Sequence, residues 1–302
     1  MIPKKNLVLY SINQSPLHIE LCLISLESLR KQSPSVKVKV SHFGKIPSHK
    51  IRKFKKLGAE LIEHPPVSSE HRFGLKWPAL VDARDYRNIL VIDADTFFFA
   101  PVEPLFAKNS KKAIIANIEY ASAGDYLRGP HLIKMRFDQK LVRKIKKKFN
   151  LAEYPIFNSS VMLFNNFSHH KVIERLPNYF SFFIDFHRGE LPYPASLWFI
   201  LEQVCGSFTL SIKPKLAYGN WNIDQVTPFH EWYHSKNKVI GPLMHYGSIH
   251  AMDFFKRFEM KSNLQRCYKA NELLKKQKYK FVGVDSAPWG SKLLPLRHQA
   301  RT

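Results

Sequence analysis

Short apolar runs alternate with helical patterns along the first part of the chain. Residues 6–10 (NLVLY) form an apolar run that predicts a strand, and residues 18–32 repeat apolar side chains at helical spacing. Residues 36–43 alternate apolar and polar positions, which predicts a half-buried strand. A helix is predicted over residues 50–57 and another strand over residues 59–64.

The same alternation continues toward the middle of the chain. Residues 73–87 predict a helix with Pro78 in its first turn. The run NILVI at residues 88–92 predicts a buried strand, and AIIANI at residues 113–118 predicts the next one. Strands that alternate with helices favour a mostly parallel sheet with helices on both faces, so we predict an α/β fold.

The second half of the chain is less regular. Residues 156–166 (IFNSSVMLFNN) predict a strong strand, followed by a helix over residues 171–186. Residues 191–208 hold two prolines and then a further helical pattern. Tryptophan, proline and glycine dominate residues 214–250, which indicates loops around a site rather than a separate core. We therefore expect one large domain that contains a smaller subregion.

Basic residues far outnumber acidic ones. The chain has 47 Lys+Arg and 24 Asp+Glu, which gives a formal charge of +23 at pH 7. A field of this sign attracts phosphates, anionic lipids or nucleic acid. The sequence has no zinc-finger spacing, no RRM aromatic signature and no basic-region heptad, so we expect no specific nucleic-acid partner.

Two basic segments have the pattern of amphipathic helices. Residues 138–151 and residues 253–280 place apolar side chains on one helical face among lysines and arginines. Such a helix either lies on an anionic membrane surface or packs its apolar stripe onto the protein core. This pattern divides the chain into a domain over residues 1–252 and a basic amphipathic C-terminal segment over residues 253–302.

Cysteine usage and hydropathy bound the protein class. The three cysteines, Cys22, Cys205 and Cys267, are widely spaced, which excludes a disulfide scaffold and favours a reducing compartment. No stretch approaches the ~20 consecutive apolar residues of a membrane-spanning helix. We therefore expect a soluble, cytoplasmic protein whose basic segments allow peripheral attachment to the cytoplasmic face of a membrane.

An acidic pair directly follows the buried run at residues 88–92. Asp93-Ala94-Asp95 places two carboxylates at i and i+2, which directs both side chains to one face of an extended chain. Hard oxygen ligands suit Mg²⁺ or Mn²⁺, and either ion can bridge a diphosphate. Ligands of such sheets bind outside the carboxyl ends of the strands, where this pair lies. On the tripeptide alone, a simple turn after a strand remains the alternative.

Four segments in this order resemble nucleotide-sugar glycosyltransferases of the GT-A fold, most of all glycosyltransferase family 8 with its lipopolysaccharide and glycogenin-like enzymes. KWPALVDARDYRNILVIDADTFFFAPVEPLF resembles the helix, strand and DxD segment of that family. IFNSSVMLFNN resembles its Phe-Asn-Ser/Thr-Gly-Val-Met-Leu-Phe-Asn strand. LEQVCGSFTLSIKPKLAYGNWN resembles its Asp-Gln helix, and MHYGSIH resembles its His-Tyr-Thr-Gly motif.

The resemblance implies a GT-A fold, with a smaller acceptor-side subregion, and a donor site around the acidic pair. Asp93, Asp95 and His245 would hold Mn²⁺ or Mg²⁺ as a cofactor, with a neutral imidazole beside two carboxylates. The implied donor contacts are Tyr10 and Ser11 for the base, Lys76 for a phosphate or the sugar, Asp93, Ala94 and Asp95 for the ribose and diphosphate, and Asn158 and Ser159 for the sugar pocket.

The resemblance also implies the reaction. Glu202 and Gln203 take the place of the family's Asp-Gln pair near the anomeric carbon and would be the catalytic residues. A sugar would pass from a nucleotide-diphosphate sugar, most simply a UDP-sugar, to a glycan or glycolipid acceptor. Family 8 implies retention of the anomeric configuration.

The sequence departs from the family pattern at several positions. Ser160 stands where the family has glycine, and Glu202 stands where it has aspartate. The Lys-Pro-Trp that usually follows the C-terminal motif is missing, and His250 lies near the place of that lysine. His250 either donates to a phosphate or packs as a core histidine.

Rival functions remain. A non-catalytic glycan- or nucleic-acid-binding protein on a glycosyltransferase-like fold would keep the core without turnover, although the intact acidic pair argues against it. A nucleotidyltransferase usually opens with a glycine-rich phosphate loop, and residues 6–18 contain no glycine.

Overall fold

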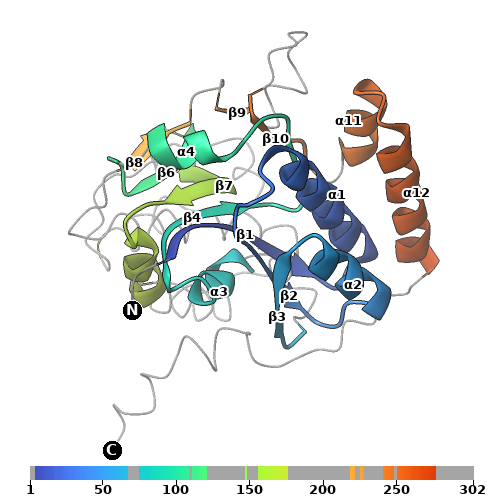
Figure 1. Cartoon of the computed structure of the whole chain (residues 1–302), viewed down its shortest axis with the longest axis horizontal. Coiled ribbons are helices and arrows are strands. Elements are labelled where there is room, and N and C mark those ends of the chain that lie inside the picture. Colours follow the sequence, from blue (N-terminus) through green and yellow to red (C-terminus); the bar gives the residue numbers. More distant parts are fainter. Residues whose placement is uncertain are drawn as a thin grey trace, which may run out of the picture.

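A seven-stranded sheet forms the centre of the protein (Figure 1). The computed structural model describes residues 4–66, 75–108, 111–120, 147, 156–175, 218–221, 225–227, 241–247 and 250–276. The strands are β1 (Lys4–Asn13), β2 (Val38–Phe43), β3 (Ala59–His64), β4 (Tyr86–Ile92), β6 (Ile114–Tyr120), β7 (Ile156–Phe164) and β8 (Tyr218–Asn220).

The sheet is mostly parallel, as the sequence predicts. Its order is β3-β2-β1-β4-β7-β6-β8. The first four of these strands are parallel to one another, β7 runs antiparallel to both of its neighbours, and β8 is parallel to β6. The carboxyl ends of β1, β2, β3 and β4 therefore lie at one edge, which is the edge that carries Asp93.

Helices cover both faces of this sheet. On one face, Val38 and Val40 of β2 belong to the core cluster that contains α1 (Pro16–Gln32) and Phe54 of α2 (Ser48–Lys56). The alternate β2 side chains, Lys39 and Ser41, point to the opposite face, where both bond Asp82 at the end of α3 (Lys76–Val81). A short helix, α4 (Glu103–Lys108), follows the acidic segment along the chain.

A second, small sheet stands beside the end of β4. It has the order β5-β10-β9 and consists of β5 (Thr96–Phe98), β9 (Val226–Thr227) and β10 (Leu243–His245). Because β5 begins four residues after β4 ends, its pairing with β10 brings residues 243–245 next to the acidic pair.

Of the C-terminal helices, the second packs against α1 and the first packs against the second. They are α11 (Ala251–Arg257) and α12 (Lys261–Lys276), and Figure 1 shows α12 alongside α1. Phe254 and Phe255 of α11 are fully buried, and Cys267 of α12 belongs to the same core cluster. Ala270, on the same side of α12, is also buried. The sequence left two alternatives for residues 253–280, a membrane-surface helix or a helix packed on the core. The described residues of this segment, 253–276, pack their apolar side chains onto the core.

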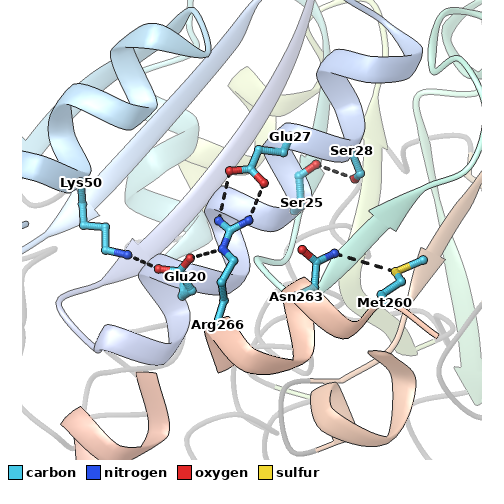
Figure 2. A network of polar contacts seen from close by, with 8 residues as sticks. All are labelled: Glu20, Ser25, Glu27, Ser28, Lys50, Met260, Asn263 and Arg266. Carbon is cyan, nitrogen blue, oxygen red and sulfur yellow. Dashed lines mark hydrogen bonds and ion pairs between the residues drawn. The ribbon is translucent and has the colours of Figure 1, made fainter. Parts of the chain in front are cut away.

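Four charged side chains join α12 to α1 and α2 (Figure 2). Arg266 donates to Glu20 through Nε and to Glu27 through both terminal nitrogens. Lys50 donates to Glu20 from the other side. We call this set (Glu20, Glu27, Lys50 and Arg266) the helix network. Its two negative and two positive charges cancel.

Several predicted elements differ from the structure at their bounds. The strand predicted as half-buried at residues 36–43 is β2, and all six of its residues are buried because both faces are covered. The helix predicted over residues 73–87 ends at Val81, and β4 has already begun at Tyr86. Bonds from Ser41 and His64 to the carboxylate of Asp82 fix the chain where it turns.

The second half agrees with the prediction in part. Residues 168–175 are helical, and the remainder of the predicted helix to residue 186 lies outside the described residues. Residues 191–208 and, apart from Lys147, residues 138–151 also lie outside them. The loops predicted at residues 214–250 contain β8, β9 and β10, which are too short to show a periodic pattern. Within the described chain, no helix is both long enough and apolar enough to cross a bilayer.

Candidate functional site

The backbone of the acidic pair is fixed between two strands. The amide of Asp93 donates to the carbonyl of Ser160 on β7 at 2.8 Å. The carbonyl of Asp95 accepts from the amide of Tyr246, just after β10, at 3.0 Å. These two bonds hold the tripeptide at the carboxyl end of β4 and leave both carboxylates for other contacts.

His245 completes a group of three ligand-type side chains. Its position opposite Thr96 in the β5–β10 pair places Nε2 3.4 Å from Oδ1 of Asp95 and 3.9 Å from Oδ2 of Asp93. One ligand atom from each of the three residues lies within 4.8 Å of the other two. Two carboxylate oxygens and one imidazole nitrogen at this spacing can converge on one divalent cation. We call Asp93, Asp95 and His245 the aspartate–histidine group.

The group is electrostatically coupled. Burial raises the pKa of Asp95, but the charge of His245 and its hydrogen bond lower it more, so this pKa lies well below its usual range. Burial lowers the pKa of His245, but Asp95 and Asp93 raise it more, so that pKa lies above its usual range. Without a cation, the imidazolium form of His245 is thus a counter-ion to the two aspartates.

Lys76 supplies a second positive charge. It is the first residue of α3, and its Nζ lies 2.8 Å from Oδ1 of Asp93 and 3.2 Å from Oγ of Ser159. The Lys76 side chain is only 7% exposed. An ammonium group held dry beside a carboxylate is well placed to meet a phosphate oxygen or a sugar hydroxyl.

The β7 residues of the site are held by local bonds. Oδ1 of Asn158 accepts from the amide of Ser160 at 2.8 Å and also from its hydroxyl. Ser160 is not among the described residues with a positive φ, so its backbone does not need the glycine of the family pattern. Its hydroxyl instead orients Asn158 next to Ser159.

The side chain of Tyr10 points away from the site. Its ring is fully buried, and its hydroxyl bonds Oγ of Ser25 on α1 at 2.9 Å. Ser11, the next residue, points to the other face of β1 and is partly exposed. A contact with a nucleotide base from Tyr10 would therefore come from its backbone, whereas Ser11 retains an accessible side chain.

Two side chains at the junction of β1 and α1, those of Asn13 and His18, belong to this region and are absent from the sequence prediction. Oδ1 of Asn13 bonds the amide of Ser15 at 2.9 Å and Nδ1 of His18 at 3.0 Å. The charge of His18 contributes to the lowered pKa of Asp95, so His18 lies on the side of the acidic pair. Asn13 ends β1 and His18 lies in the first turn of α1, so both stand at the carboxyl end of a parallel strand, which is the same signal that points to Asp93.

Three buried polar atoms around the group have no hydrogen-bond partner in the described part of the chain. They are Nδ1 of His245, Oγ1 of Thr96 and the hydroxyl of Tyr246. Unpaired buried polar atoms cost free energy, and they cluster where a ligand or ordered water completes the structure. Their presence around the two aspartates fits a site built to receive a polar ligand.

The remaining predicted residues are placed as follows. His250 precedes α11, with its amide bonded to the carbonyl of Gly247 and its Nδ1 3.9 Å from Oδ2 of Asp253. Its contact with a phosphate stays a prediction. Glu202 and Gln203 lie outside the described residues, so their roles also stay predictions.

No protein-family model matches the sequence, and no curated protein matches it significantly. Several solved structures are similar in chain path. They include the galactosyltransferase LgtC in complex with donor and acceptor sugar analogues (14% identity, 80% of this chain and 86% of that chain, TM-score 0.48). They also include the glycosyltransferase GlyE of Streptococcus pneumoniae TIGR4 (13% identity, 80% and 55%, TM-score 0.47) and the bifunctional WbbM (12% identity, 82% and 46%, TM-score 0.47). At this identity and TM-score, these similarities carry no conclusion about the activity.

Proposed function

We propose that this protein is a metal-dependent glycosyltransferase that moves a sugar from a nucleotide-diphosphate sugar to a glycan or glycolipid acceptor. The observation that carries the proposal is the convergence of Asp93, Asp95 and His245 at the carboxyl end of β4, with Lys76 bonded beside them. Sites of α/β sheets lie at this edge. The aspartate–histidine group fits Mn²⁺ or Mg²⁺, since it combines hard carboxylate oxygens with an imidazole.

In this proposal each residue has a defined task. Asp93, Asp95 and His245 hold the cation, which supplies Lewis-acid stabilisation of the departing diphosphate. Lys76 leaves its contact with Asp93 to pair with a phosphate or sugar oxygen of the donor. Asn158 and Ser159 orient the sugar hydroxyls through hydrogen bonds. Ser11 lies at the end of β1, where the family contacts the base.

The proposal extends to the chemistry at the anomeric carbon. Glu202 and Gln203, on the sequence resemblance, stabilise the positive charge that develops on the sugar ring. A UDP-sugar is the proposed donor and retention the proposed outcome, both on the family resemblance. Changing Glu202 to Gln and Gln203 to Ala separately should lower turnover while leaving nucleotide binding intact.

Calorimetric titration with UDP, in the presence and absence of Mn²⁺, tests the proposal directly. We expect UDP to bind in a metal-dependent way, GDP and CDP to bind more weakly, and Asp95→Asn to lose the metal dependence. A second assay follows release of UDP from UDP-glucose and UDP-galactose without an acceptor. Equal nucleotide affinity with and without metal, or metal dependence that survives Asp95→Asn, would contradict the assignment.

A further inference from the structure

The outer face of α2 carries an unbroken set of positive charges. Lys45, just before the helix, and Arg52, Lys53, Lys55 and Lys56 within it are all exposed. No acidic residue occurs between Gly44 and Ala59. We call these five residues the α2 basic face.

The packing of α2 makes this face a fixed feature. Phe54 is fully buried in the core cluster with α1, and Ile51 packs against the same cluster. At helical spacing, Arg52 and Lys56 then lie one turn apart on the opposite, solvent side. Lys53 and Lys55 lie on the two flanks of that side, so cations cover the exposed half of the helix.

The five cations have no ion-pair partner within the described part of the chain. Lys50, on the same helix, bonds Glu20, and Lys39 of β2 pairs with Glu60. By contrast, no member of the α2 basic face forms an ion pair with any residue that the structure describes. Cations in the last turn complement the helix dipole, but that effect needs only one or two charges and does not involve Lys45 or Arg52.

The position of α2 relates this face to the candidate site. Because β2 is parallel to β1 and β4, the loop after Phe43 starts at the sheet edge that carries Asp93. The helix begins five residues later, at Ser48, so its first turn lies toward that edge. The helix then runs back toward the amino ends of the strands, because Ala59, three residues after the helix, pairs with Val38 at the start of β2. The four cations of residues 52–56 therefore lie toward the edge opposite the candidate site, and a partner held there would leave that site open.

We propose that the α2 basic face is a docking surface for an anionic lipid bilayer. A bilayer supplies the complementary charge, and it needs no shape-matched groove, which suits a helix that offers only exposed cations. Proteins that grip single-stranded nucleic acid add aromatic side chains for base stacking, and the one aromatic ring of α2, Phe54, is buried. This inference does not depend on the proposed function.

Vesicle co-sedimentation tests the proposal on the full chain. The probes are phosphatidylglycerol–phosphatidylcholine vesicles and pure phosphatidylcholine vesicles, at low and at high salt. Each Lys or Arg near an anionic surface strengthens binding about fivefold. The variant Arg52→Gln/Lys53→Gln/Lys55→Gln/Lys56→Gln should thus bind anionic vesicles at least about a hundredfold more weakly than the wild type.

The matched control removes the same charge elsewhere. Lys111→Gln/Lys171→Gln/Lys256→Gln/Lys269→Gln changes four exposed lysines on other parts of the chain. It should retain most of the vesicle affinity, and thermal melting should show both variants folded.

Three outcomes would overturn the proposal: no binding of the wild type to anionic vesicles at low salt, equal loss in the two variants, or stronger binding to a poly-uridine RNA than to anionic vesicles. UDP binding by the α2 variant should remain that of the wild type. A failure of the docking surface is thereby separated from a failure of the proposed activity.

Discussion

Two clusters of partly buried charge in this protein differ in how completely they are paired. In the helix network, two carboxylates meet two cations, and Glu20 alone contacts both Lys50 and Arg266 (Figure 2). The aspartate–histidine group places two carboxylates against one lysine and a titratable imidazole. Around it, buried polar atoms of three residues lack a partner within the described chain.

This difference in pairing indicates a structural role for the helix network and a functional role for the aspartate–histidine group. A network whose charges cancel and whose bonds are made fixes the packing of two helices and leaves nothing for a ligand to do. In the aspartate–histidine group the charge balance depends on the protonation of His245, and the nearby unpaired polar atoms cost folding free energy. Such arrangements are found at sites that a ligand completes. Substitutions in the helix network should therefore change stability, and substitutions in the aspartate–histidine group should change activity.

The largest expected effect is the loss of activity in Asp95→Asn. Removing one of three proposed metal ligands should lower sugar transfer, or UDP release from a UDP-sugar, by about a hundredfold or more. The free energy of unfolding without metal should also fall, because the contact with His245 that lowers the pKa of Asp95 is lost. Steady-state rates in Mn²⁺ and urea unfolding measure the two quantities. If Asp95→Asn kept full activity and lost much stability, the aspartate–histidine group would have a structural role and not a functional one.

A smaller effect is expected from metal on thermal stability. Mn²⁺ at about 100 times its dissociation constant should stabilise the wild type by about 2.7 kcal/mol, which raises the melting temperature by a few degrees. Asp95→Asn should not respond, whereas Arg266→Met should show the same increment as the wild type. Differential scanning fluorimetry with Mn²⁺ and with a chelator gives the comparison, and Ca²⁺ is a useful control ion. A response that disappears in Arg266→Met would mean that the two clusters are not independent.

Arg266→Met should destabilise the protein by about 2 kcal/mol. It leaves Glu20, which is almost fully buried, with only Lys50 as a partner, and breaking a buried ion pair costs more than an exposed one. Urea unfolding measures the loss. Adding Glu20→Gln to this variant should recover part of the stability, since the unpaired charge is then removed. No recovery in the double variant would show that the arginine acts through packing alone.

The smallest effect concerns acid stability. Burial raises the pKa of Glu20, but hydrogen bonds from Lys50 and Arg266 lower it more, so its pKa in the folded protein lies below the ordinary value. The stabilisation is then complete above the unfolded pKa of about 4.3 and is lost as the pH falls through the lower folded value. The difference in unfolding free energy between wild type and Glu20→Gln should shrink as the pH falls from about 5 to about 3. If this difference in unfolding free energy stayed constant over that pH range, the ion pairs of Glu20 would not be the source of its stabilising effect.

Local patterns were sufficient to predict the sheet and the acidic pair. A buried run followed by Asp93 and Asp95 can be identified within ten residues of sequence, and strand–helix alternation predicts the parallel sheet. Lys76 and His245 entered only through the family resemblance, because the bonds that bring them to the acidic pair join elements far apart in the chain. The strands that position His245 have two or three residues, too few for any periodicity.

Other features depend on tertiary contacts that no local pattern encodes. Helix α3 ends where Ser41 of β2 and His64 of β3 bond the carboxylate of Asp82. The helical spacing of residues 73–87 does not contain this information, so it predicts too long a helix. The direction of the Tyr10 ring follows from which face of β1 meets α1, and the family resemblance alone does not specify it. His18 is missed because a histidine in the first turn of a helix carries no signal until the strand edge beside it is known.

The contact between α1 and α12 also governs the order in which the protein is completed. Glu20 and Arg266 are separated by 246 residues, and the ribosome adds residues at about 5–20 per second. About 10–50 s therefore pass between the synthesis of the carboxylate and the synthesis of its arginine. Throughout that interval the side of α1 that α12 will cover faces water or a chaperone. The first βα units can form early, but this side of α1 becomes buried only when α12 has left the exit tunnel.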